Sequence, residues 1–485
     1  MRKRFEAQLQ FGLTPIEDVK IPEKSRDELP PVLASLQWIF ITPEINEQIF
    51  ELLEERVCGN KKETGRSGMD LWHILVLGVV RLALDCDYDR LEYLVNYDVL
   101  LRQIMGLEPV SPLPFATGFH QKTISENVCH VDEELLSKIN EIIVKSGRPL
   151  FFLKKEDEKI EAKADSYVLE SNVHFPTDVN LLWDSCRKCI DIVNNLFKNS
   201  NLSGWRKAKD WRKKIKKLMH KCGKIKKAGG PNKEERLKKI VEEFLAKCYE
   251  LEAKIFESIE ELKSQALTLL ESLKIKEFEY YYDMLIKHID LVDRRLLKGE
   301  TIPHNEKVFS IFEPHTEWVN KGKFSPPIEL GHKLLITTDK YDLILDYKVM
   351  DQTADNNETL SLVDRLLNSY GEDSIESISF DKGFSDKEDR ELLEFYIPEV
   401  IMSKKGRLSQ ADKERESGKK FKELRNKHSA IESNINSLEH HGLNRCPDKG
   451  LRGFKRYAGF GVLAYNLHKI GNKLLEKQRR RKKAA

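Results

Sequence analysis

The stretch KIEAKADSYVLESNV, residues 159–173, decides the fold of this chain. Within it Ile160, Ala162 and Ala164 alternate with charged residues. This period of two is typical of a β-strand with one covered face. On either side the pattern is helical, because apolar residues recur at three- and four-residue spacing over 70–107 and a helical pattern returns after Asp178. The sequence therefore predicts a first strand that lies between two helical regions.

Strand and helix patterns alternate again in the second half of the chain. Residues 334–349 (LLITTDKYDLILDYKV) predict a β-hairpin with polar turn residues. Further strands are predicted at 375–380 and 400–403, and helices at 357–369, 388–395 and 421–438. Together with the strand at 159–173, these elements predict a mixed α/β sheet that is interrupted after its first strand.

The interruption has the pattern of packed helices. From Val241 to Leu273 apolar residues follow one another at intervals of three and four, which is a heptad seam with one stutter. Residues 181–227 are also helical in pattern, and the AGGP sequence at 228–231 separates the two regions. We expect an antiparallel helical hairpin or small bundle at 179–300, inserted into the α/β core.

These patterns divide the chain into six segments. They are an N-terminal arm (1–28), an all-helical domain (29–145), the first part of the α/β core (146–178), the helical insertion (179–300), the second part of the core (301–475) and a basic tail (476–485).

Composition excludes several classes of protein. The 485 residues are 40% hydrophobic and 33% charged, so the chain can bury a full core and is not disordered throughout. The longest apolar run, 74–84, carries Arg81 and is too short to cross a bilayer. No export signal follows the basic start, which predicts a cytoplasmic protein. Eight cysteines are too sparse for a disulfide framework and are expected to be free thiols.

Basic residues gather in two places although the net charge is only +3. Residues 205–227 hold twelve Lys and Arg against Asp210 alone, and 473–483 hold seven against Glu476. Either patch could neutralise the phosphates of a nucleic acid. A solvated helix face and a frayed terminus would have the same composition, and the pattern alone leaves both interpretations open.

Three carboxylates are candidates for a metal site. Asp165 lies in the first strand, Asp381 directly follows the strand at 375–380, and Glu432 lies on the last predicted helix. Strand ends present side chains to ligands in α/β sheets, and Mg²⁺ prefers oxygen ligands. An Asp at a strand end also commonly forms a turn, so the pattern by itself does not decide.

Several blocks of the sequence resemble bacterial insertion-sequence transposases of the DDE class, within which we predict the ISNCY-like group. DSYVLESNVHFPTD (165–178) is similar to the block around the first catalytic Asp, and SFDKGF (379–384) to the second catalytic motif. Other blocks follow in the family's order over roughly 70–475: SIFEPHTEW (310–318), KGK (321–323), ELGHK (329–333), HSAIESNINSLEHHGLNRC (428–446), RGF (452–454) and LAYNLHKIG (463–471).

The resemblance implies an RNase H-like core with Asp165, Asp381 and Glu432 as a catalytic triad. The family's triad holds two Mg²⁺ ions, which Mn²⁺ could replace, and Asp165 would bridge them. The implied activity is cleavage of double-stranded DNA at the terminal inverted repeats of the element and strand transfer into target DNA. The implied partners are those two DNAs and a second copy of the chain in a synaptic complex, associated with the nucleoid while bound.

The chain departs from the family at two positions that usually contact phosphate. His428 stands four residues before Glu432, where the family often has Arg, and Glu439 stands seven after it, where the family often has Lys. Arg425 or Arg445 could substitute. The full set of predicted DNA contacts is Arg206, Lys207, Arg212, Lys213, Lys216, Lys217, Lys333, Arg425, His428 and Arg445.

Several alternatives remain open at this point. Residues 29–145, with Lys61, Lys62 and Arg66, could read the inverted repeats or mediate dimerisation. Trp205 and Trp211 could stack on unpaired bases or pack the inserted helices. The chain could also be an RNase H-like endonuclease without strand transfer, or a catalytically inactive DNA-binding protein. Other acidic residues near the third position of the triad are Glu414, Glu416, Glu423 and Glu439.

Overall fold

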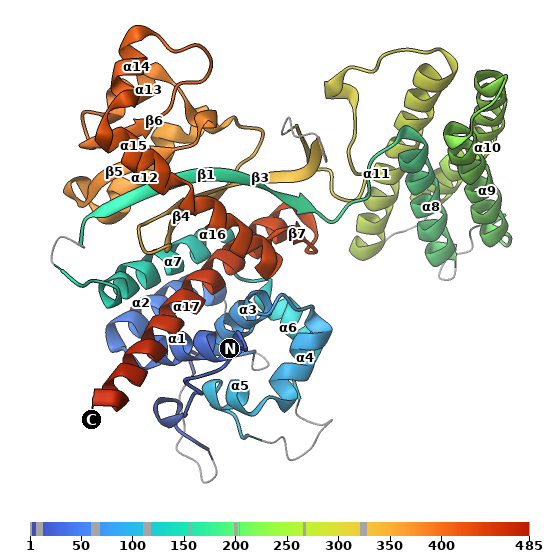
Figure 1. The fold of residues 1–485 in the computed structure, drawn as a ribbon. Helices are drawn as coiled ribbons and strands as arrows, with labels where there is room; N and C mark the ends of the chain where they lie inside the picture. The colour runs from blue at the N-terminus through green and yellow to red at the C-terminus, as the bar shows by residue number, and fades with distance from the viewer. Residues whose placement is uncertain are drawn as a thin grey trace. The chain divides into compact units, whose positions relative to one another are not determined.

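The chain forms two compact units, each with its own hydrophobic core (Figure 1). The computed structural model describes residues 2–5, 13–59, 68–109, 118–154, 158–197, 202, 204–264, 268–320 and 327–484. Residues 1–172 and 319–485 form one unit, which we call the sheet unit, and residues 173–318 form the other, which we call the helical unit. The insertion after the first core strand, expected from the sequence, is confirmed.

A seven-stranded mixed sheet organises the sheet unit. Its order is β2-β3-β1-β5-β6, with β4 beside β3 and β7 beside β1. The central strand β1 runs antiparallel to β3 and parallel to β5, which is parallel to β6. The strands are β1 (Ile160–Ser171), β2 (Glu317–Asn320), β3 (Ile328–Thr338), β4 (Ile344–Val349), β5 (Ile375–Phe380), β6 (Glu399–Met402) and β7 (Arg445–Cys446). This arrangement confirms the predicted mixed α/β class and agrees with an RNase H-like core.

The predicted hairpin is present as β3 and β4. Asp339 fixes its turn, because one carboxylate oxygen accepts hydrogen bonds from the backbone N–H groups of Tyr341 (2.8 Å) and Leu343 (3.1 Å). Asp342 takes the left-handed conformation, with φ at 63°, which Asp tolerates better than most residues. The polar turn residues read from the sequence therefore have a defined structural role.

Helices cover the sheet and share its core. They are α1 (Leu29–Ile41), α2 (Pro43–Leu53), α3 (Leu71–Ala83), α4 (Tyr88–Tyr97), α5 (Val99–Ile104), α6 (Gln121–Val128), α7 (Glu133–Gly147), α12 (Thr359–Tyr370), α13 (Lys387–Leu393), α14 (Gln410–Ser417), α15 (Lys419–His428), α16 (Ala430–Leu438) and α17 (Gly450–Ala484). One hydrophobic core includes residues of α1 to α7, of the strands and of α17. In the structure, residues 29–145 and the sheet thus form one unit.

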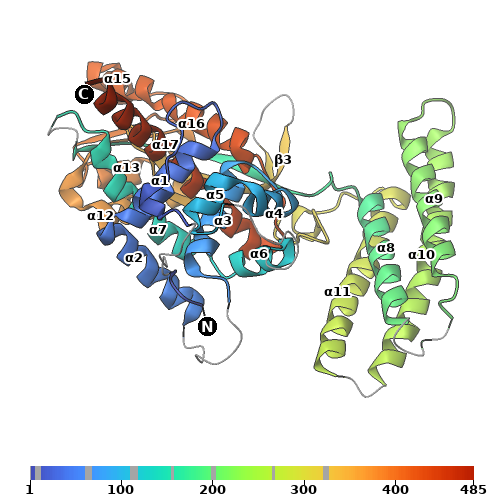
Figure 2. The same cartoon turned by 90° about the horizontal axis from the view of Figure 1, so that it is seen from below.

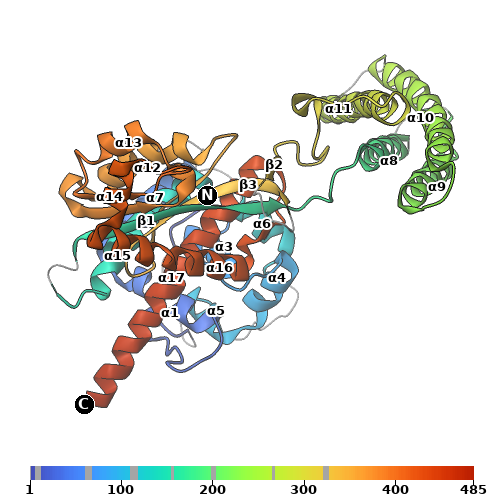
Figure 3. The same ribbon diagram turned by 45° about the horizontal axis from the view of Figure 1, so that its top comes forward.

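The long helix α17 passes through this core and packs against α1, α3 and α7. Its approach to α1 is close: a Cβ on Gly471 would lie 1.7 Å from the carbonyl oxygen of Pro31, so only glycine fits there. The C-terminal end of α17 extends beyond the rest of the unit (Figure 3). The residues predicted as a basic tail are the last turns of this helix, up to Ala484.

In the described part of the helical unit the long helices are α8 (Asp178–Phe197), α9 (Ala208–Lys227), α10 (Lys233–Lys263) and α11 (Leu269–Val292). Helix α8 packs against α9 and α11, and α10 packs against α9 and α11, so the four close into a bundle (Figure 2). The buried residues of α10 include Val241, Phe244, Cys248, Leu251 and Ile255. The first part of the predicted seam is therefore the core of this bundle.

The predicted seam is wrong at its C-terminal end. It was expected to continue to Leu273, but α10 ends at Lys263 and a new helix begins after Thr268. Thr268 and Glu271 form a capping box, which starts α11 and turns Leu269 and Leu273 outward, 80% and 55% exposed. Ala266, also part of the predicted seam, lies outside the described residues.

The helix predicted at 421–438 is two helices, α15 and α16, separated at Ser429. The Ser429 hydroxyl donates a hydrogen bond to the carbonyl oxygen of Asn426 at 2.8 Å, in competition with the helical backbone pattern. The helix predicted at 421–438 is consequently interrupted, and Glu439 lies in the turn of π-helix that follows α16.

Candidate active site

Three predicted carboxylates meet in one pocket of the sheet unit. Asp165, Asp381 and Glu432 all line a pocket of about 600 Å³, although they lie on β1, after β5 and on α16. Asp355 and Lys333 line the same pocket. The structure thus brings together three residues that the sequence separates by up to 267 positions (432 − 165).

The register of the sheet explains this meeting. Ala164 of β1 pairs with Phe380 of the parallel strand β5, so the residues that follow them, Asp165 and Asp381, lie at the same level. Asp381 ends its strand as an N-cap, accepting a hydrogen bond from the backbone N–H of Gly383 at 3.3 Å. Glu432 lies in the first turn of α16.

These three carboxylates lack the cations that other acidic residues of the unit have. Buried Asp339 pairs with Arg148 at 2.9 Å, and Asp448 pairs with Arg81 at 2.6 Å. Within the residues that the structure describes, Asp165, Asp381 and Glu432 take part in no such ion pair. The pocket therefore holds negative charge that the protein itself leaves uncompensated.

Asp165 shows the electrostatic result of this arrangement. Burial raises the pKa of its carboxyl group to about 7, and the charges of Asp381, Asp355 and Glu432 act in the same direction. A hydrogen bond from the backbone N–H of Ser166, at 2.7 Å, opposes the shift. A bound cation would relieve the same repulsion that a proton relieves.

Asp355 is a fourth carboxylate, which the sequence did not reveal. One of its oxygens accepts from Lys333 Nζ at 2.8 Å and the other from the Ser166 hydroxyl at 2.8 Å. A Cβ on Gly383 would lie 3.1 Å from Asp355, which places it beside the loop after Asp381. Asp355 lies in the connection between β4 and α12 and not at the end of a strand, so no local sequence pattern could have identified it.

Residues 315–467 match a family described as "Transposase DDE domain". The match includes Asp381 and Glu432. Asp165 precedes the matched residues in the sequence and is separated from them by the residues of the helical unit. The match supports the predicted insertion-sequence DDE transposase, while the ISNCY-like group stays a prediction. No curated protein and no solved structure matches the chain.

The lining of the pocket reduces the number of candidates for the third carboxylate of the triad. Of the neighbouring acidic residues, Glu439 also lines the pocket, whereas Glu414, Glu416 and Glu423 do not. Glu416 accepts from the backbone N–H of Lys404, and Glu423 faces Lys427 at 3.2 Å. Two candidates therefore remain for this position, Glu432 and Glu439.

The predicted DNA contacts are divided between the two units. In the DDE domain, Lys333 is bound to Asp355, His428 Nδ1 lies 3.0 Å from the Ser379 hydroxyl, Arg425 is exposed and Arg445 pairs with Glu170 at 3.0 Å. Exposed positions on or next to α9, in the helical unit, hold Arg206, Lys207, Arg212, Lys213, Lys216 and Lys217. All ten assignments stay predictions, and Lys61, Lys62 and Arg66 lie outside the described residues.

Other candidates from the sequence have structural roles. Trp205 is 2% exposed and donates from Nε1 to the Ser258 hydroxyl at 2.7 Å, which confirms the packing interpretation over base stacking. Trp211 packs against the same core, with Lys247 over its ring. All eight cysteines are free thiols, as expected. No helix in the described part of the chain has the length and apolar character needed to cross a membrane.

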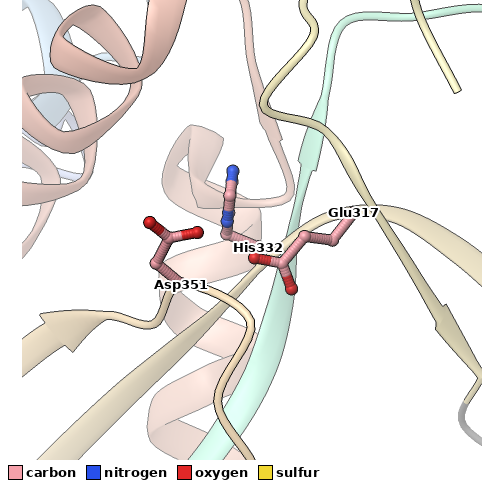
Figure 4. A group of neighbouring side chains, drawn as sticks. All are labelled: Glu317, His332 and Asp351. Atoms are coloured by element: carbon pink, nitrogen blue, oxygen red, sulfur yellow. The ribbon is translucent and has the colours of Figure 1, made fainter. Parts of the chain in front are cut away.

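A second group could also hold a cation. Glu317 of β2, His332 of β3 and Asp351, just after β4, offer ligand atoms that all lie within 4.8 Å of one another. Figure 4 shows the two carboxylates turned toward each other beside the His332 ring. His332 Nδ1 is also 3.1 Å from the carbonyl oxygen of Met350. Glu317 and His332 lie within blocks of the family resemblance, but no pattern in the sequence assigned them to a metal.

Proposed function

We propose that this chain is a DNA transposase that cleaves double-stranded DNA at insertion-sequence ends and joins the ends to target DNA, with Asp165, Asp381 and Glu432 as metal ligands. The observation that carries the proposal is the meeting of these three carboxylates in one pocket of a chain that contains a DDE domain, with no ion pair to any of them among the described residues.

The donor set fits hard divalent cations. Mg²⁺ is bound by a few carboxylate oxygens together with waters and substrate phosphates, and this pocket offers carboxylates and open volume. Asp165, Asp381 and Glu432 would hold two such ions, which would supply activation of the attacking hydroxyl and stabilisation of the leaving oxygen in an in-line displacement. Mn²⁺ has similar ligand preferences and could substitute.

The protein's own groups would position the ions and the DNA. Asp381 is held by its N-cap hydrogen bond and Asp165 by the Ser166 N–H, so both carboxylates are oriented before a ligand arrives. Asp355 holds the Lys333 ammonium at the wall of the pocket, where it can meet a phosphate oxygen. A homodimer would bring two such pockets to two ends of the element.

The test is an assay of cleavage and strand transfer. Purified full-length chain is incubated with Mg²⁺, a target plasmid and a labelled duplex copied from the genomic DNA that flanks the reading frame. We expect cleaved and joined products. The variants Asp165→Asn, Asp381→Asn and Glu432→Gln should each lower the rate about 10³-fold or more, since each removes several kcal/mol of charge stabilisation.

Matched variants separate the alternatives. Glu414→Gln, on α14 and outside the pocket, should keep the wild-type rate. If Glu439→Gln is inactive and Glu432→Gln is active, Glu439 is the third ligand. Cleavage without joined products would identify an endonuclease, and activity that survives all triad substitutions would refute the proposed site.

A further inference from the structure

Lys163 is a buried lysine that donates no hydrogen bond to any residue that the structure describes. It lies on β1, two residues before Asp165, and is 8% exposed. Among the described residues its ammonium nitrogen has one charged neighbour, Asp342 Oδ1, at 4.0 Å, and donates no hydrogen bond. Asp342 is also 3.7 Å from Lys469 and accepts from Asn434 at 3.3 Å. A buried ammonium with so weak a partner is costly, unless a ligand completes its interactions.

The Lys163 side chain lines a pocket of about 300 Å³. Lys340 and Lys427 line it too, against one carboxylate, Glu161, so the lining residues carry a net charge of +2 (three lysines minus one glutamate). Ser377 and Ser379 add hydroxyl groups. At about 30 Å³ per water, the pocket has room for a phosphate group with several waters.

This pocket is next to the acidic one. Side chains alternate along a strand, so Lys163 and Asp165 lie on the same face, about 6.6 Å apart at the strand rise of about 3.3 Å per residue. Ser379 pairs with Lys163 across β1 and β5 and precedes Asp381 by two residues in the same way.

We propose that the pocket lined by Lys163, Lys340 and Lys427 binds a backbone phosphate of the DNA, one or two nucleotides from the phosphate that is cleaved. The inference rests on the proposed function, because the acidic pocket defines where the cleaved phosphate lies. It assigns the neighbouring phosphate to Lys163, which is already desolvated and therefore interacts more strongly with an anion than an exposed lysine does.

DNA binding by the full chain tests this assignment apart from catalysis. Affinity for a labelled duplex of arbitrary sequence is measured by fluorescence anisotropy, with Ca²⁺ in place of Mg²⁺, over a series of salt concentrations. Lys163→Met should weaken binding about eightfold at 0.1 M salt and reduce the slope of log affinity against log salt by about one, as expected for one lost phosphate contact. Lys163→Arg should restore most of both.

Two controls make the result specific. Lys138→Met removes a charge from the exposed face of α7, where Lys138 pairs with Glu134, and should leave affinity within about twofold. Lys163→Met should not lower the melting temperature, because replacing a poorly paired buried charge by an apolar side chain is neutral or stabilising. A lower melting temperature with unchanged affinity would show that Lys163 is structural and overturn the proposal.

The remaining outcomes also decide. Unchanged affinity and salt slope in Lys163→Met would refute the phosphate contact, even if the triad variants abolish cleavage as proposed. Triad variants that keep cleavage would refute the proposed function, whatever Lys163→Met does to binding. If inorganic phosphate stabilises the wild type but not Lys163→Met, and DNA affinity is equal in both, the pocket binds free phosphate and the DNA assignment is wrong.

Discussion

The helical unit and the sheet unit differ in where their charged side chains lie and in how these side chains are paired. In the helical unit the basic side chains of α9 are exposed, and the two buried groups Trp205 Nε1 and Asp184 have partners in the same unit. In the sheet unit Asp165, Asp381 and Glu432 share one pocket and form no ion pair among the described residues, and Lys163, two residues before Asp165, donates no hydrogen bond to those residues. A cluster of charged side chains without oppositely charged partners is a candidate for a ligand-binding site. Under the proposed function, we expect the ions and the scissile DNA to bind the sheet unit.

The largest predicted effect tests whether the two units are separate folding units. Trp205→Ala removes a fully buried side chain and its hydrogen bond from the core of the helical unit and should cost that unit about 3–5 kcal/mol. Because the two cores share no residues, calorimetry should show two transitions, of which only one shifts.

The matched control lies in the other core. Trp72 is fully buried in the sheet unit and donates from Nε1 to the carbonyl oxygen of Ile104 at 2.9 Å. Trp72→Ala should shift the other transition by a similar amount. A single transition that both variants lower equally would show that the units unfold together, and the comparison would lose its basis.

The second prediction tests the end of the apolar seam in the helical unit. Leu262 is 3% exposed and Leu269 is 80% exposed, although both fit the same heptad pattern. Leu262→Ala should destabilise the helical unit by about 2–5 kcal/mol, whereas Leu269→Ala should change its stability by less than about 0.5 kcal/mol. Chemical denaturation followed by helix content measures both. Equal losses in the two variants would mean that the seam continues past Lys263.

That pair of leucines shows how far periodicity can be used. Spacing alone identified the strand at β1, the hairpin and the buried face of α10, because these patterns follow from which side of an element is covered. The same spacing continued past Lys263 by coincidence. Thr268, followed three residues later by Glu271, is the sequence pattern of a capping box and indicates that a new helix begins there. The heptad spacing continues across this pattern, so the spacing alone does not show where α10 ends.

The candidate site was predictable only in part for a different reason. Asp165, Asp381 and Glu432 were found because family motifs surround them, and the register of β1 and β5 then explained their meeting. Asp355 and Lys163 belong to no such motif. Asp355 is notable for its contacts with Lys333 and Ser166, and Lys163 for the lack of a hydrogen bond among the described residues. Both features depend on how distant segments pack. Sequence periodicity contains no information on such contacts.

The third prediction concerns cations. Mg²⁺ should stabilise only the transition of the sheet unit, by about 1.4 kcal/mol at ten times its dissociation constant, and Asp165→Asn should abolish most of this gain. Because the pKa of Asp165 is raised to about 7, protons compete with the cation below that pH, and the gain should be smaller at pH 6 than at pH 8. Melting curves with and without Mg²⁺ at both pH values measure it.

The outcome also separates the two candidate cation groups. If Asp165→Asn keeps the full gain while His332→Gln loses it, the cation binds at Glu317, His332 and Asp351 instead. A gain in the transition of the helical unit that His332→Gln leaves unchanged would contradict the assignment of charge chemistry to the sheet unit.

The smallest predicted effect belongs to the helical unit and comes from His174. Its Nε2 lies 2.5 Å from Asp184 Oδ2, and this hydrogen bond raises the pKa of His174 above its usual value. A histidine whose folded-state pKa is raised adds stability that is complete below the unfolded pKa, about 6.5, and is lost as the pH rises through the folded pKa. His174 is half exposed, so solvent screening limits the effect to about 0.5 kcal/mol.

Melting temperatures of the wild type and of His174→Gln, measured from pH 5.5 to pH 9, isolate this contribution. The helical-unit transition of the wild type should exceed that of the variant by about 1–2 °C at the acid end, and the two should converge at the alkaline end. The sheet-unit transition should be the same in both proteins at every pH. Only a protonated imidazole gains from the negative charge of Asp184, so the difference should shrink as the pH rises. A difference that grew with pH would mean that neutral His174 is the stabilising form and would contradict this prediction.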